Sequence, residues 1–163
     1  MSAPPAVAGP DGRSSTVSLV LFRLDGWNCA IAASAVVEIV AAVATSPLPG
    51  QPGYIAGIID LRGTIVPVLD LRVRFGRPSR PMELADQLIV VQARGRLLAL
   101  WVDEVEAFAP AGSIGWNSAG GLVVGDRSLA GVAASDDGLA TIHDVGAFVE
   151  QCEADAVFEG AGA

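Results

Sequence analysis

Residues Tyr54 to Arg72 read YIAGIIDLRGTIVPVLDLR, and this stretch decides the fold. Two runs of strand-forming residues, Ile55 to Leu61 and Thr64 to Leu69, flank the dipeptide Arg62–Gly63. Because glycine tolerates the positive φ of a tight turn, the stretch predicts a β-hairpin. Pro67 lies in the return run and has no backbone N–H to donate, so we expect this strand at a sheet edge or at a bulge.

A short helix is expected directly after the hairpin. Asp70 can accept a hydrogen bond from the free amides at the start of the segment Leu71 to Phe75. Gly76 can then end the helix, because glycine adopts the left-handed conformation without strain. The residues that follow, GRPSRP at 76–81, are the expected connector to the second half of the chain.

Short aliphatic and β-branched runs separated by turn residues fill the rest of the chain. They lie at 17–24, 27–31, 36–43, 87–93, 97–102, 105–108, 129–134 and 139–142. With the hairpin they make about ten short strands in two groups, at the spacing of small closed β-barrels. The expected fold class is all-β, with two small barrels and short helices, the last of which is capped by Asp144 and runs to Cys152.

The two ends of the chain differ in composition from this patterned region. Residues 1–15 are rich in alanine, proline, glycine and serine, and residues 153–163 are acidic and rich in small residues. Such segments cannot bury enough apolar surface to be ordered. We therefore expect a flexible N-terminal tail at 1–15, one domain of two barrel subdomains at 16–152, and an acidic flexible tail at 153–163.

The composition excludes several classes of function. Lysine does not occur, so a phosphate loop or Schiff-base site that needs a side-chain amine is excluded. The net charge of −8 argues against nucleic acid as a partner, because such binding depends on cationic neutralisation of phosphate. The most apolar window, residues 29–44, contains Glu38 and is too short to cross a bilayer. We expect a cytoplasmic protein with no direct membrane insertion.

The residues of catalytic type do not form a recognisable catalytic set. His143 is the only histidine, and we expect it to pack at the end of a strand. The two cysteines, Cys29 in an apolar run and Cys152 near the tail, have no partners at metal-ligand spacing, and we expect Cys29 buried and Cys152 exposed. No cofactor, metal or small-molecule substrate is predicted.

A cluster of carboxylates has both a structural and a functional interpretation, and two tryptophans have a structural one. Asp103, Glu104 and Glu106 follow a strand, and we interpret them as a solvated face or a docking patch for a basic partner. A small hydrolase that uses these carboxylates or His143 is the least supported alternative. Trp27 and Trp101 are the expected core anchors of the two barrels.

The hairpin stretch resembles the signature of the CheW family of bacterial chemotaxis coupling proteins. The family pattern is Gly, two hydrophobic residues, any residue and Leu-Arg-Gly, then hydrophobic-Pro-hydrophobic-hydrophobic-Asp-Leu-Arg, and it matches Gly57 to Gly63 and Val66 to Arg72. Further stretches match in order at 19–30, 37–39, 97–105 and 129–148. The resemblance therefore covers residues 16–152.

This resemblance implies both a fold and a function. The fold would be two intertwined SH3-like five-stranded barrels. The function would be that of a non-enzymatic adaptor that links the cytoplasmic tips of chemoreceptors to the histidine kinase CheA, whose regulatory domain shares the fold. The receptor tip, a helical hairpin, would dock in a hydrophobic groove between the barrels, and the adaptor would be recruited from the cytoplasm to membrane-associated receptor arrays.

The resemblance also assigns roles to individual residues. Glu38 and Arg62 would lie on the receptor-facing side, with Val36 and Val37 supplying apolar contact. Ile65, Val66 and Leu69 would fall in the barrel core. Asp103 to Val105 would be mainly structural. From the residues alone, Arg62 could instead form an intramolecular pair, for example with Glu38, or a solvated turn.

Three positions depart from the family pattern. Members usually carry an aromatic residue near the position of Cys29, Asn in place of Asp60 and Leu in place of His143. A carboxylate at Asp60 lies two positions from Arg62, and we expect it to tether that arginine within the molecule. The alternative function is therefore a divergent paralogue that binds the kinase without the receptor, or that serves a pathway other than flagellar motility.

Overall fold

The hairpin expected at Arg62–Gly63 is present in the computed structural model, which describes residues 7–8, 14–15, 17–111, 116–118, 128–135 and 138–161. Strand β6 (Ile55–Leu61) pairs antiparallel with β7 (Thr64–Asp70), with positive φ at both turn residues. Asp60 Oδ1 accepts a hydrogen bond of 2.7 Å from the Gly63 amide and so stabilises the turn. The first element predicted from the sequence is confirmed.

Helix α1 (Leu71–Arg74) begins and ends as the sequence predicts. Asp70 Oδ1 accepts a hydrogen bond of 3.0 Å from the Arg72 amide, and Gly76 has a φ of 79° just beyond the helix. Strand β7 does not lie at a sheet edge, because it lies between β9 and β6, but its pairing with β6 contains the expected irregularity, a register shift between Ile55 and Gly57. Pairing with β9 begins only at Val68, so the missing N–H of Pro67 falls just outside that ladder.

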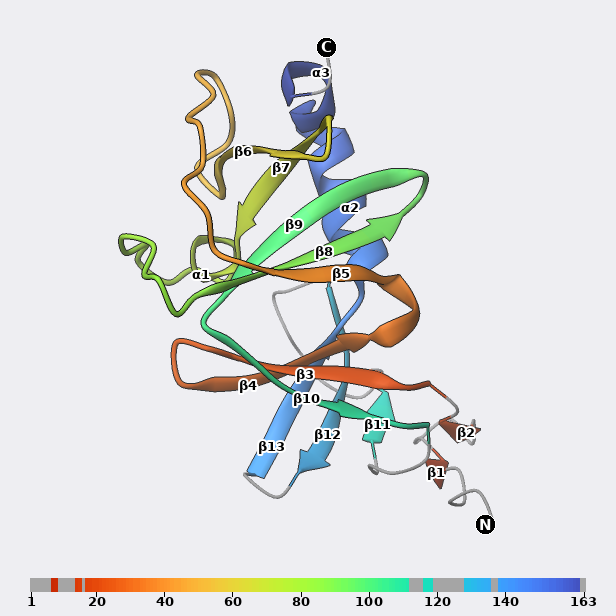
Figure 1. The fold of residues 1–163 in the computed structure, drawn as a ribbon. Coiled ribbons are helices and arrows are strands. Elements are labelled where there is room, and N and C mark those ends of the chain that lie inside the picture. Colours follow the sequence, from red (N-terminus) through yellow and green to blue (C-terminus); the bar gives the residue numbers. More distant parts are fainter. Residues whose placement is uncertain are drawn as a thin grey trace.

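The two halves of the fold are a six-stranded and a five-stranded sheet, one above the other in Figure 1. The first sheet has the order β10 (Glu104–Ala109), β3 (Leu19–Leu24), β4 (Trp27–Ala32), β13 (Gly138–His143), β12 (Leu129–Ser135) and β11 (Trp116–Ser118). The second has the order β5 (Val36–Ala41), β8 (Gln87–Ala93), β9 (Arg96–Val102), β7 and β6. A short pair, β1 (Val7–Ala8) with β2 (Ser14–Ser15), precedes them. The mostly β fold with few short helices confirms the expected fold class.

The chain passes between the two sheets more than once, which intertwines them. The 3-10 helix η1 (Ala33–Ala35) leads from β4 into the second sheet, and the chain returns to the first sheet at Asp103. Strand β13 then pairs parallel with β4, and helices α2 (Val145–Ala154) and α3 (Val157–Ala161) pack back on β8 and β7 of the second sheet. Each sheet is therefore stabilised by contacts with chain segments that lie far away in the sequence.

A backbone bridge joins the two edges of the second sheet. Ser46, which follows edge strand β5, exchanges two hydrogen bonds of 2.9 Å with Ile58 of edge strand β6. Gly57 has a φ of 154°, and a Cβ there would lie 2.5 Å from the Ser46 carbonyl oxygen. Only glycine permits this close approach, so the conformation of one residue allows the sheet to close.

Among the described residues, apolar clusters hold the sheets together. One lies between the two sheets and helix α2, and we call it the shared core; its members include Phe22, Ile31, Leu100 and Phe148. A second lies within the second sheet around Val66, Val68 and Trp101. A third lies within the first sheet around Leu19 and Ile142. The shared core contains residues from both sheets, so neither sheet buries its apolar face alone.

Several core expectations need correction. Trp101, Val66 and Leu69 are buried as expected, but Trp27 is 41% exposed and Ile65 is 44% exposed. The two exposed residues lie within two positions of a hairpin turn, Trp27 opposite Leu24 and Ile65 opposite Asp60, where fewer elements can pack on them. Both cysteines are buried, so the expectation that Cys152 is exposed is wrong; it faces the shared core from α2.

The C-terminal segment also differs from the expected flexible tail. Helix α2 runs to Ala154, and α3 places Val157 in the shared core with no exposed surface. The Tyr54 hydroxyl donates a hydrogen bond of 2.5 Å to Asp155. These contacts order residues whose composition alone predicted a flexible tail.

Of the expected N-terminal tail, only β1 and β2 belong to the described residues. Among the helices of the described chain, none has the length and apolarity that a bilayer crossing requires.

Candidate partner-binding site

Arg62 and Glu38 form an ion pair on the surface of the second sheet. Arg62 Nη1 lies 3.3 Å from Glu38 Oε2, and Nη2 bonds the other carboxylate oxygen. The Glu38 carboxylate raises the pKa of Arg62 by hydrogen bonding and then by its charge. The pair joins the tip of the β6–β7 hairpin to strand β5, and it leaves the Arg62 side chain 73% exposed. A partner can therefore still reach the guanidinium.

The expectation that Asp60 tethers Arg62 is wrong. Asp60 is occupied with the Gly63 amide inside the hairpin turn. Arg62 has a φ of 50°, and its side chain reaches Glu38 on a different strand instead. The intramolecular pair left open by the sequence is thus present, with Glu38 as the partner.

The valines beside this ion pair are not equivalent. Val36 is half-buried and packs against the shared core, whereas Val37 is 48% exposed. The register between β5 and β8 shifts at this point, because Val36 lies opposite Val91 and Glu38 lies opposite Val90. Val37 is the extra residue of this bulge. Of the two, only Val37 offers exposed apolar surface.

The apolar surface continues along the same segment. Ile39 and Val43 are 40% and 49% exposed, and with Val37 they form what we call the β5 strip. Sequence reasoning missed Ile39 and Val43, although alternation along a half-buried strand gives the signal that residues 37 and 39 share exposure. Glu38 lies between Val37 and Ile39 on β5, where exposure alternates, so the β5 strip and the Arg62–Glu38 pair are neighbours along the chain on opposite faces of the strand.

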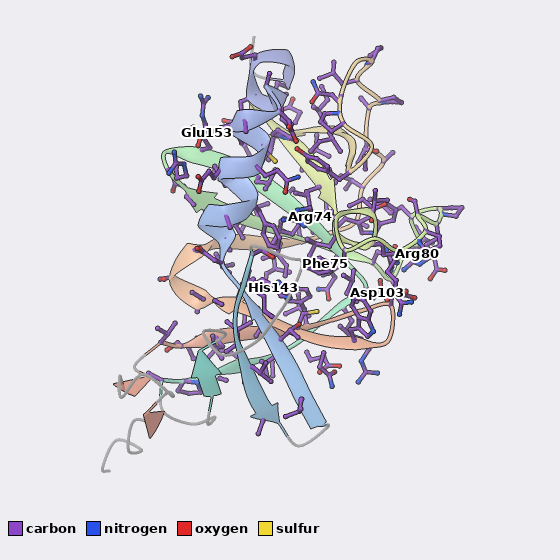
Figure 2. The ribbon with its side chains drawn as sticks, turned by 180° about the vertical axis from the view of Figure 1, so that it is seen from behind. Arg74, Phe75, Arg80, Asp103, His143 and Glu153 are labelled. Atoms are coloured by element: carbon purple, nitrogen blue, oxygen red, sulfur yellow. The ribbon has the colours of Figure 1, made fainter. Side chains whose placement is uncertain are left out.

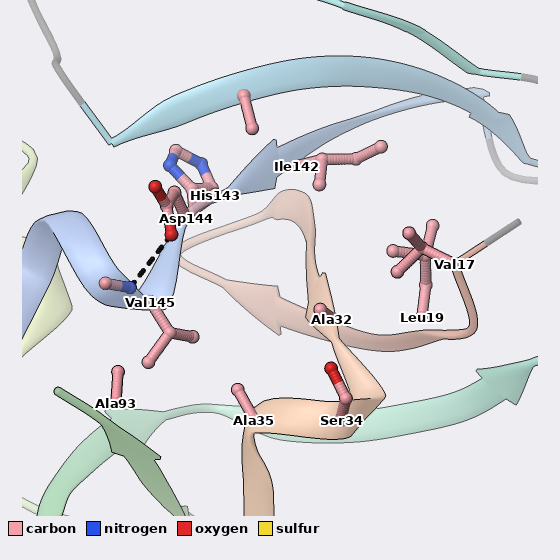
Figure 3. Close-up of a pocket in the computed structure, with 12 residues that line it drawn as sticks. Val17, Leu19, Ala32, Ser34, Ala35, Ala93, Ile142, His143, Asp144 and Val145 are labelled. Carbon is pink, nitrogen blue, oxygen red and sulfur yellow. Dashed lines mark hydrogen bonds between the residues drawn. The ribbon is translucent and has the colours of Figure 1, made fainter. Parts of the chain in front are cut away.

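An apolar groove of about 380 Å³ opens between the two sheets. Figure 3 shows its walls, which come from β3 and β13 of the first sheet, from η1, from the end of β8 and from the start of α2. Its lining includes Leu19, Ala32, Ala35, Ala93, Ile142 and Val145. The small alanines leave room for larger apolar side chains of another molecule.

His143 lies at the end of β13, where it lines the groove and is 7% exposed. Its Nδ1 lies 2.9 Å from Ser128 Oγ and its Nε2 lies 2.9 Å from Thr141 Oγ1. Its ring stacks on Phe75 with centroids 4.7 Å apart. The expectation of a packing residue at a strand end is confirmed, and Asp144 caps α2 by accepting a bond of 2.9 Å from the Gly146 amide.

The expected acidic patch is largely neutralised within the molecule. Asp103 pairs with Arg72 and Arg80, and Glu106 lies 2.8 Å from Arg23. A hydrolase built on these carboxylates gains no support, because Asp103 and Glu106 face arginines rather than a second carboxylate. The described residues contain no group of histidine, cysteine and acidic side chains that could hold a metal ion.

Comparisons with known proteins place most of the chain in one family. The family model of the CheW-like domain matches residues 18–153. A chemotaxis protein CheW of Rhizobium meliloti is 32% identical over 87 residues, which are 53% of this chain and 56% of the relative. One of Bacillus subtilis is 31% identical over 86 residues, 53% of this chain and 55% of the relative. The chain thus spans about half the length of the curated relatives it matches.

A solved structure is similar over more of the chain. The scaffolding protein TtCheW of Thermoanaerobacter tengcongensis gives a TM-score of 0.69 at 32% identity, covering 78% of this chain and 88% of that one. The likeness includes residues of both sheets, because this coverage exceeds either sheet alone. With the family model matching from before β3 to the end of α2, the chain belongs to the CheW-like domain family.

Proposed function

We propose that this chain is a non-enzymatic chemotaxis adaptor that couples the cytoplasmic tips of chemoreceptors to the regulatory domain of a CheA-type histidine kinase. Membership of the CheW-like family supports this proposal, as does its similarity to chemotaxis and scaffolding proteins. The single observation that carries it is the apolar groove between the sheets. An adaptor needs such a surface, and it needs no catalytic group.

The groove suits a helical partner. A helix places apolar side chains at intervals of three and four residues along one face, and a groove lined by small residues accepts them as anchors. The alanines on η1 and β8, Ala35 and Ala93, face this space in Figure 3. A receptor tip, which is a helical hairpin in this family, is the partner that we assign to the groove.

The Arg62–Glu38 pair and Val37 would add contacts at the side of this interface. Glu38 lies three residues beyond Ala35, so the groove and the charged surface follow one another along the chain. A planar guanidinium that is mostly exposed can still bond a carboxylate or carbonyl of a partner. We therefore retain Arg62, Glu38 and Val37 as partner-binding residues, with Val36 supporting the strand from inside.

The test is to measure binding of a purified receptor-tip fragment and of the kinase regulatory domain to Arg62→Ala, Glu38→Arg and Ala93→Trp. We expect weaker binding of the receptor tip to all three, with the circular dichroism spectrum and melting temperature of Arg62→Ala unchanged. Arg94→Ala is the matched control, since Arg94 also lies at a hairpin tip with a φ of 53° and pairs with a carboxylate, that of Glu153.

Three results would count against the proposal or part of it. If the parent protein bound neither the receptor tip nor the kinase domain, the adaptor function would be wrong for this chain. If it bound the kinase domain alone and Glu38→Arg had no effect, the chain would instead be a paralogue that links kinases without a receptor. Equal binding by Arg62→Ala and the parent would remove Arg62 from the interface.

A further inference from the structure

Three arginines and four aspartates form a connected cluster where the two sheets meet. Its members are Asp25, Asp70, Arg72, Arg77, Arg80, Asp86 and Asp103. They come from the β3–β4 turn, the start of α1, the connector after α1 and the β9–β10 junction. In Figure 1, α1 and the β3–β4 turn lie at the left, whereas the β4–β5 connection that borders the groove lies at the right. The cluster and the groove thus occupy opposite sides of the junction.

Asp103 is the central residue of the cluster, and it lies at the point where the chain crosses from the second sheet to the first. One carboxylate oxygen forms an ion pair with Arg72 and accepts a hydrogen bond of 3.1 Å from Arg80 Nη2. The other accepts a hydrogen bond of 2.9 Å from the backbone amide of Asp25 in the first sheet. The Asp103 amide itself donates to the Arg23 carbonyl at 3.0 Å. One side chain therefore fastens the first sheet to arginines held by the second.

Asp86 anchors the other end of the cluster inside the second sheet. Both of its oxygens accept hydrogen bonds of 2.8 Å from Arg80, and the Trp101 indole N–H donates to it at 3.0 Å. Asp86 is 2% exposed, and Figure 2 shows Arg80 beside Asp103 at this edge of the molecule. Arg80 consequently bridges a buried carboxylate of the second sheet and the crossover residue.

Disrupting the cluster would leave the buried guanidinium of Arg72 without a carboxylate partner. It is 2% exposed, and its guanidinium lies 5.5 Å from the Trp101 ring centroid. Burial lowers the pKa of Arg72, and the charge of Arg80 lowers it further. A buried guanidinium needs its carboxylate, since an unpaired buried charge is strongly unfavourable. Asp103 supplies this carboxylate, and Arg72 thereby fixes the Asp103 side chain against the second sheet. The other Asp103 oxygen binds the first sheet through the Asp25 amide.

We propose that this cluster is an ionic clasp that fixes the angle between the two sheets and so sets the width of the groove on the opposite side, with Asp103 as the positioning residue. The groove walls come from both sheets, Leu19 and Ile142 on one side and Ala93 on the other. A change of angle at the clasp therefore moves one wall relative to the other. The role of the groove as a receptor site rests on the proposed function, but the clasp does not.

The test measures a distance between the two sheets, which changes when the angle between them changes. Spin labels at Leu139→Cys in the first sheet and Thr64→Cys in the second give an inter-sheet distance distribution by pulsed electron paramagnetic resonance. Both positions are exposed, and the two native cysteines are buried. We expect Asp103→Asn to broaden or shift the distribution. Glu106→Gln is the matched control, because it removes a nearby exposed ion pair and should leave the distribution unchanged.

A folded Asp103→Asn protein with the distribution of the parent would overturn the clasp. If Asp103→Asn does not fold, Arg80→Gln decides in the same way, because the Arg80 side chain is 29% exposed and bridges the same two carboxylates. Binding of the receptor-tip fragment should weaken roughly tenfold in the variant that broadens the distribution. A broadened distribution in a protein whose parent form binds no receptor tip would support the clasp and contradict the proposed function.

Discussion

Arg62 and Arg94 occupy the same position in two hairpins, and the comparison shows what an exposed ion pair does and does not indicate. Each has a positive φ at the turn, and each pairs with a carboxylate from another element, Glu38 or Glu153. The pairing alone therefore does not mark a binding residue. Arg62 differs because exposed Val37 lies beside its partner, whereas Arg94 faces the acidic helix α2.

The two thiols give a prediction at the same scale. Burial raises the pKa of Cys29 to about 11, with the hydrogen bond from Thr141 opposing it, and burial raises the pKa of Cys152 to about 12. Since the thiolate is the reactive form, neither should react with a disulfide reagent such as Ellman's reagent at pH 8 while the protein is folded. Both should react in denaturant. Rapid labelling of either cysteine in the native protein would contradict this.

Among the elements, the β6–β7 hairpin contributes most to both the fold and the candidate site. Its turn presents Arg62, its return strand supplies Val66 and Val68 to the core, and its first strand receives the bridge from Ser46. Sequence pattern predicted the hairpin because its turn chemistry is local. The pattern did not show that β7 lies inside the sheet, since that depends on β9, about 30 residues further along the chain.

Gly57→Ala tests the closure of the second sheet. The added methyl group would lie 2.5 Å from the Ser46 carbonyl oxygen, so the bridge to Ile58 must separate. We expect a loss of about 2 kcal/mol or more in the free energy of unfolding, measured by urea denaturation. Gly63→Ala is a useful comparison, because no atom lies within 4 Å of its added Cβ and only the positive φ opposes it. Equal destabilisation by the two would argue against the clash.

At the scale of the whole molecule, the two sheets depend on carboxylates that must stay ionised. Burial alone would raise the pKa of Asp86, but hydrogen bonds from Arg80, the Glu83 amide and Trp101 outweigh it and lower the pKa from 3.8 to about 2. A depressed pKa contributes stability above the unfolded value, and that contribution is lost as the pH falls toward the folded value. The relevant window is therefore about pH 4 down to about pH 2.

Urea denaturation across that window should show the effect. The parent protein should lose stability between pH 4 and pH 2, and part of that loss should be missing in Asp86→Asn, which has no carboxyl to titrate. The difference between the two curves isolates Asp86 from the other acids. At pH 7 the variant should be less stable by about 2 kcal/mol, because Arg80 loses a buried partner. Parallel curves would show that Asp86 does not titrate as described.

The sequence by itself determined the features that depend on neighbours along the chain. The hairpin at Arg62–Gly63, the caps at Asp70 and Asp144 and the all-β class all follow from turn chemistry, side-chain hydrogen bonding and apolar periodicity. The family resemblance then added Glu38 and Arg62 as candidate residues. These signals are local, so no knowledge of the packing was needed to find them.

Only the tertiary structure decided the features that depend on distant segments. It showed that Glu38 rather than Asp60 holds Arg62, that the C-terminal residues are ordered by Val157, and that Asp103 joins the two sheets. It also placed Trp27 and Ile65 at the surface. Each depends on which segment packs opposite, and burial and charge pairing between remote residues are properties of the assembled fold.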